Sequence, residues 1–269
     1  MNNEIQAAAQ AVIERAIERH GGRDRYDQIE RVVCKVYSLG GFGMSRRGLK
    51  TRFPMPDIVT VMPRHNKLVL HDYAGPGRDC IYDQGRVAVV ATGEAPVFES
   101  DNFRRDMMSV SRLGRPWSTL EATYFFGYAM THYGSLPFSL QGVEVLAMKT
   151  RGRGDWRTRI DFRYPAGAHT HSPIETMYFD SSDLLMRHDY RPEVSSPVAR
   201  AANFLLEYKS FDGYLVTERR KVFFRLGRFV TPLVVLDGGL RVLEVVRRSP
   251  DVVATETPRP RETASSHAT

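Results

Sequence analysis

The chain opens with a helical pattern. Between residues 3 and 19, apolar side chains recur every three or four residues, as they do on one face of an amphipathic helix. His20-Gly21-Gly22 follows, and glycine readily adopts the left-handed conformation found just past a helix end. The pattern predicts one helix with a single apolar face.

Alternation of apolar and polar residues dominates most of the remaining chain and is typical of strands with one buried face. Turn-forming residues separate neighbouring runs, for example Asp83-Gln84-Gly85 and Ser181-Ser182-Asp183. Asp237-Gly238-Gly239 has the same composition and predicts a further hairpin. The predicted strands are 31–37, 57–62, 67–73, 78–82, 86–90, 156–163, 174–180, 184–190, 204–209, 214–224, 233–236 and 240–246.

One segment in the middle of the chain differs from both patterns. Ser118 and Glu121 have the spacing of a capping box, which predicts a helix over 120–133. This helix has no polar face, because Tyr124, Phe125, Tyr128 and their apolar neighbours occupy most of its circumference. Such a helix has to be enclosed on nearly all sides.

Together these elements predict a mainly β protein of the α+β class. An antiparallel sheet of this size is expected to curl or close. We expect an incomplete β-barrel, with the N-terminal helix beside it and the hydrophobic central helix plugging its concave face. Residues 1–248 are predicted to form a single half-barrel domain, and residues 249–269, which lack apolar periodicity, a disordered tail.

The charge and the termini exclude some functions. The net charge of +7 invites a nucleic-acid hypothesis. However, the basic residues are scattered and alternate with apolar ones, so a solvated outer sheet face explains them better and no specific nucleic acid is expected. No run of apolar residues is long enough for a transmembrane segment, and no signal peptide is evident, so we expect a cytoplasmic protein. Cys34 and Cys80 lie in strand-like runs and are predicted to be buried free thiols.

Several short motifs resemble the bacterial lipoprotein-carrier fold of LolA and LolB, most closely its cytoplasmic actinobacterial-type members. They are the helix with His20-Gly21-Gly22, the hairpin from Tyr178-Phe179-Asp180 to His188-Asp189-Tyr190, Phe211-Asp212-Gly213, Thr217-Glu218-Arg219-Arg220, and the mid-chain Tyr124-Phe125-Phe126-Gly127-Tyr128-Ala129-Met130. The resemblance implies an incomplete barrel around a hydrophobic cavity, which in the carriers holds lipoprotein acyl chains. The same fold also serves a cofactor-free enzyme that forms the violacein precursor.

We therefore expect the protein to bind a hydrophobic small molecule or an acyl chain, as a carrier would. The alternative is a cofactor-independent enzyme of natural-product (secondary metabolite) biosynthesis, such as a cyclase, isomerase or hydrolase. A third hypothesis is an interaction protein whose basic sheet docks an acidic partner. No cofactor motif is present, so no cofactor is expected. The sequence does not determine the oligomeric state. The predicted ligand-binding residues are Tyr124, Phe125, Tyr128, Trp156, Tyr178 and Tyr190.

Two histidines are candidate catalytic residues. His188 shares a strand face with Met186 and Tyr190, so it could act as a general acid or base in an apolar pocket, or be a hydrogen-bonded core histidine. His132 follows Tyr128 at helical spacing and would place a polar group beside the cavity.

One histidine pair could bind a metal. His169 and His171 are two residues apart and Glu175 follows closely, which is a possible ligand set. Gly167 and Pro173 favour a surface loop instead, and no metal site is predicted.

Overall fold

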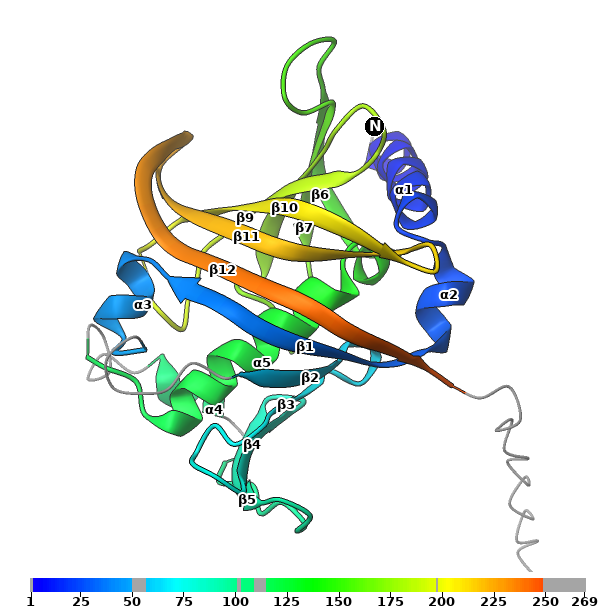
Figure 1. Ribbon diagram of the computed structural model, residues 1–269. Coiled ribbons are helices and arrows are strands. Elements are labelled where there is room, and N and C mark those ends of the chain that lie inside the picture. Colours follow the sequence, from blue (N-terminus) through cyan, green and yellow to red (C-terminus); the bar gives the residue numbers. More distant parts are fainter. Residues whose placement is uncertain (1, 50–56, 101–102, 109–114, 197, 249–269) are drawn as a thin grey trace, which may run out of the picture.

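The structure is a computed structural model that describes residues 2–49, 57–100, 103–108, 115–196 and 198–248. Twelve strands in this part of the chain form one antiparallel sheet in the order β5-β4-β3-β2-β1-β12-β11-β10-β9-β8-β7-β6. The sheet curls without closing, as expected, and β5 and β6 are its two edges (Figure 1). The tail predicted for 249–269 lies outside the described residues. The strands are β1 (Ile29–Gly40), β2 (Ile58–Met62), β3 (Lys67–Leu70), β4 (Arg78–Asp83), β5 (Arg86–Ala91), β6 (Glu144–Thr150), β7 (Thr158–Arg163), β8 (Ile174–Phe179), β9 (Leu185–Tyr190), β10 (Ala201–Phe211), β11 (Tyr214–Leu226) and β12 (Phe229–Arg247).

The pairing of β1 with β12 joins the two halves of the sheet. Each half is otherwise a simple meander, β1 to β5 on one side and β6 to β12 on the other. The β1–β12 ladder runs from Ile29 opposite Arg247 to Gly40 opposite Asp237. A sequence pattern shows which strands exist, but this pairing depends on a contact between distant parts of the chain.

The long helix α5 (Thr119–Ser135) crosses inside the curl (Figure 1). Its capping box is present, because Glu121 N donates to Ser118 Oγ and Ser118 N donates to Glu121 Oε2. Residues from Glu121 to Ala129 are all buried, so the helix is enclosed as its composition requires. It packs on β2, β3, β4 and β5. The prediction of a hydrophobic helix on the concave face is confirmed.

The N-terminal helix α1 (Asn2–Arg19) covers the other half of the sheet. Its apolar side, including Ile13 and Ile17, is buried in a core with β7, β8 and β10. Gln6 reaches the edge strand: its Nε2 donates to Val143 O (3.0 Å), and its Oε1 accepts from Val145 N (2.8 Å). The helix therefore occupies some of the free backbone groups that an edge strand would otherwise expose.

Three short helices complete the description: α2 (Arg23–Gln28), α3 (Phe42–Arg46) and α4 (Phe103–Met107). Two 3₁₀ turns, η1 (Pro63–His65) and η3 (Phe138–Leu140), flank α5. No described helix is long and apolar enough to cross a bilayer.

One predicted hairpin is wrong. Asp237-Gly238-Gly239 does not form a turn but lies within β12, which continues from Phe229 to Arg247. The two glycines serve the packing of the sheet instead. A Cβ on Gly239 would come within 2.4 Å of the Tyr37 ring, so Gly239 lets that ring lie against the strand. Gly238, on the opposite face by strand alternation, borders the hollow described next.

Candidate functional site

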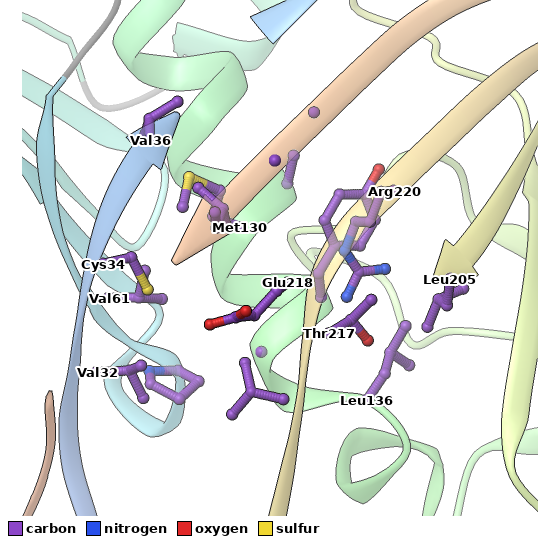
Figure 2. A pocket seen from close by; sticks show the side chains of 18 of the residues that line it. Val32, Cys34, Val36, Val61, Met130, Leu136, Leu205, Thr217, Glu218 and Arg220 are labelled. Atoms are coloured by element: carbon purple, nitrogen blue, oxygen red, sulfur yellow. The ribbon is translucent and has the colours of Figure 1, made fainter. Parts of the chain in front are cut away.

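A hollow lies between α5 and the inner face of β1, β10, β11 and β12 (Figure 2). Its cavity volume is about 130 Å³. Most of its wall is apolar. Val32, Cys34 and Val36 line it from alternate positions of β1, and further wall residues are Val61, Phe125, Met130, Leu136, Leu205, Val216 and Leu240.

A few polar groups interrupt this wall. Glu218 and Arg220 enter it from β11, as Figure 2 shows, and Tyr133 and Tyr208 contribute aromatic rings. Glu218 is held by its neighbours, since Lys209 Nζ lies 2.8 Å from its Oε2 and Val242 N donates to its Oε1 (2.9 Å). The hollow is thus an apolar pocket with few polar groups, the usual composition of a small-molecule site.

A buried polar cluster lies next to this hollow, where α5 meets β8 and β9. Glu175 Oε2 accepts hydrogen bonds from His132 Nε2 (2.9 Å) and His188 Nε2 (2.6 Å). Its Oε1 accepts from the backbone N–H groups of His171 (2.9 Å) and Ser172 (3.1 Å). The carboxylate therefore has four donors.

The electrostatics of Glu175 follow from these contacts. Burial alone would raise its pKa, but the two histidines, by charge and hydrogen bonding, hold the pKa well below its usual range. Burial in turn lowers the pKa of His188, against the opposing effect of Glu175. The two directions favour an ionised Glu175 carboxylate beside a neutral His188 ring.

His171 connects the cluster to three tyrosines. Its Nδ1 lies 3.1 Å from Tyr128 Oη and its Nε2 lies 2.7 Å from Tyr133 Oη, which is 2.9 Å from Tyr190 Oη. Burial lowers the pKa of His171 well below its usual value, so the ring is neutral and can accept at Nδ1 while donating from Nε2. Because Tyr133 also lines the hollow, it is the point where the polar cluster and the apolar pocket meet.

Two histidines and one carboxylate are also a possible metal-ligand set. The ligand atoms of His132, Glu175 and His188 all lie within 4.8 Å of one another. Around zinc, with metal–ligand distances of about 2.1 Å, tetrahedral ligand atoms are about 3.4 Å apart. The 2.6 and 2.9 Å separations are shorter and are those of hydrogen bonds. A metal would have to push the rings apart, and the absence of a metal site stays a prediction.

The predicted site residues lie in four places. Of these residues, all of which the structure describes, Phe125 alone lines the hollow. The buried cluster brings together His132, His188, Tyr128 and Tyr190, and His132 also borders a second, more polar cleft. Tyr124, which is also on α5, packs against the rings of Tyr82 on β4 and Phe103 on α4.

The remaining two predicted residues lie away from both features. Tyr178 Oη donates to Asp189 Oδ2 (3.0 Å), and the side chain points to the face of β8 opposite Glu175 and Met177. Trp156 packs edge-on against Tyr178. Alternation along β8 places this pair on the outer side of the sheet.

Sequence reasoning missed several of the residues that matter here. His171 was expected in a surface loop, but it is fully buried because Tyr128, Tyr133 and Tyr190 surround it. Glu175, noted beside it, is the centre of the cluster. Arg220 could have been found from its register, since it shares an inward strand face with Val216 and Val222.

Comparisons with known proteins found matches among solved structures. No protein-family model and no curated protein matches the chain. Among solved structures, a LolA superfamily protein from Nitrosomonas europaea is 12% identical with a TM-score of 0.47, covering 90% of this chain and 95% of the other. A DUF1329 family protein from Desulfovibrio piger is 11% identical with a TM-score of 0.41, covering 90% and 93%.

Proposed function

We propose that the protein binds a hydrophobic small molecule or an acyl chain in the hollow beneath α5 and acts as its carrier. The observation that supports this is the apolar wall contributed by β1, β2, β10 and α5 around an unfilled space. Side chains in a protein core normally leave few voids larger than a water molecule. A space lined by valine, leucine, methionine and phenylalanine favours an apolar occupant.

The test compares two variants on one strand. Cys34 faces the hollow, whereas Val33 points to the other side of β1 and is not part of its wall. Cys34→Leu adds volume to the space, and Val33→Leu adds a methylene group to the outer side. We expect the wild type and Val33→Leu to bind dodecan-1-ol by fluorescent-probe displacement, and Cys34→Leu to bind it at least about tenfold more weakly. Equal binding by all three proteins, or no binding by the wild type, would contradict the proposal.

A cofactor-independent enzyme is the second candidate, and one observation favours it. The Tyr133 hydroxyl joins the wall of the hollow to His171, so a proton could pass between a bound molecule and the buried cluster. Native mass spectrometry of protein purified from its own host would identify the retained molecule. An enzyme would convert that molecule on further incubation, seen as a change in its mass or, for an isomerisation or cyclisation, in its chromatographic retention and fragmentation, and a carrier would release it unchanged.

A further inference from the structure

Arg220 stands out among the charged groups of the hollow. Its Nη1 atom is buried and has no hydrogen-bond partner in the protein. Its guanidinium carbon lies 4.3 Å from the centroid of the Tyr133 ring, which is the contact that holds it. Within the described part of the chain, no carboxylate pairs with it. Buried arginines are ordinarily paired, because an uncompensated buried charge is costly.

The charged residues next to Arg220 on β11, in contrast, have partners of opposite charge. Arg219 and Lys221 alternate to the outer face, where both lie near Asp237, at 3.6 and 3.5 Å respectively. On the inner face, Glu218 is the one acid close in sequence to Arg220, and it is already bound to Lys209 and to the N–H of Val242. Arg220 is therefore left facing the hollow without a counter-charge.

The sheet also leaves room beside this guanidinium. Gly238 is paired directly opposite Arg220 on β12, and Leu205 is opposite it on β10. A Cβ on Gly238 would meet one atom within 4 Å, the end of the Leu236 side chain (Cδ2, 3.1 Å), and no atom of Arg220, so this glycine leaves the side of the strand next to the guanidinium uncovered. Because Gly238 has no side chain, the wall of the hollow is low next to the cationic group, and the apolar wall continues from there.

We propose that Arg220 binds the anionic head group of an amphiphile whose apolar tail occupies the hollow. The inference rests on the proposed function and names its ligand class: a long-chain molecule ending in a carboxylate or a phosphate. The planar guanidinium matches both groups with two parallel hydrogen bonds, and these bonds are stronger than neutral ones. The apolar walls around Val32, Val61 and Leu136 would receive the tail.

Matched ligands with one tail and different heads test this proposal. We would measure, by isothermal titration calorimetry at neutral pH, the binding of dodecanoate, dodecyl phosphate and dodecan-1-ol to the wild type and to Arg220→Met. The wild type should prefer at least one anionic ligand over the alcohol. Arg220→Met should lose about ten- to a hundredfold in affinity for that anion, the range expected for hydrogen bonds to a charged group. Which anion shows the loss decides between the carboxylate and the phosphate.

Two controls accompany this measurement. Arg219→Met removes the neighbouring arginine from the outer face and should leave all three affinities as in the wild type. Retained binding of dodecan-1-ol by Arg220→Met shows that the variant is folded and the hollow intact, and Arg220→Lys should be intermediate for the anion. Equal affinities for alcohol and anions in the wild type, unchanged in Arg220→Met, would overturn the head-group inference while the proposed function stands. Failure of the wild type to bind any of the three would overturn both.

Discussion

Gly127 of α5 lies directly against the ring of Tyr82 on β4. A Cβ at this position would be 2.0 Å from Tyr82 Cγ and 2.4 Å from Tyr82 Cβ, so rotation of the ring could not relieve the clash. Gly127→Ala should therefore lower the free energy of unfolding by at least about 2 kcal/mol, despite the roughly 1 kcal/mol that alanine gains in a helix. Chemical denaturation measures the difference.

Gly134 near the end of the same helix provides the control. A Cβ there would be 3.2 Å from Pro63 Cβ, which requires only a small shift. Gly134→Ala should stay within about 1 kcal/mol of the wild type, because the helix-propensity gain opposes the closer contact. If both variants unfold at the same denaturant concentration, α5 is not held against β4 as described.

Acidification should destabilise the protein through its buried histidines. Burial lowers the pKa of His20 from 6.5 to about 4 and also lowers the pKa values of His171 and His188. Between pH 6.5 and 4 the unfolded state therefore binds more protons than the folded state, and stability falls as the pH falls. His20 alone accounts for about 3 kcal/mol over this window.

The variant that tests the contribution of His20 is His20→Gln. In the wild type the ring Nδ1 contacts Ala16 O at 2.7 Å, and the Nε2 is buried without a partner. The variant should reduce the slope of unfolding free energy against pH by up to about 1.4 kcal/mol per pH unit between pH 6 and 4.5. His65→Gln, at an exposed position, is the matched control. A slope that is the same in all three proteins would disprove the assignment.

Glu175 should be the most costly acid to neutralise. Glu175→Gln replaces an acceptor of four hydrogen bonds with an amide whose N–H₂ faces the Nε2 atoms of His132 and His188. We expect the free energy of unfolding to fall by about 1.5–3 kcal/mol, the range for losing hydrogen bonds to a charged group. Glu144→Gln is the control, because the pair of Glu144 with Arg163 is exposed and should contribute at most about 1 kcal/mol. A loss at Glu175 no larger than at Glu144 would show that the buried contacts add no stability.

The sequence predicted α5 well because the evidence was local. Ser118 and Glu121 define its start, and the lack of a polar face requires enclosure on the concave side. The same kind of local evidence gave a wrong prediction, a hairpin turn, at Gly238 and Gly239. Their composition indicates a turn, but both lie inside a strand that pairs with distant residues: Gly238 is opposite Arg220 on β11, and Gly239 packs against the Tyr37 ring of β1.

The candidate site, more than the fold, depends on contacts between residues that are far apart in the sequence. His132 and His188 were both candidate residues, but the carboxylate that joins them, Glu175, comes from β8. Its position depends on the pairing of β8 with β9 and on where α5 packs. A periodic pattern in the sequence does not predict contacts between residues on different elements. The hollow itself required the pairing of β1 with β12, since Val32 and Cys34 line one side of it and Arg220 the other.

The two cysteines offer a direct chemical probe of the hollow. Both thiols are buried and free, as predicted, and burial raises the pKa of Cys34 to about 12 and that of Cys80 to about 11. Because the thiolate is the reactive form, native protein at pH 8 should react with a charged thiol reagent far more slowly than unfolded protein.

Cys34 lines the hollow, whereas Cys80 is enclosed beneath α5. A small apolar maleimide should therefore label Cys34 first, and saturating dodecan-1-ol should slow that labelling without changing the rate at Cys80. Peptide mass spectrometry after timed labelling gives both rates, and equal labelling of Cys34 with and without the alcohol would mean that the alcohol does not occupy this hollow.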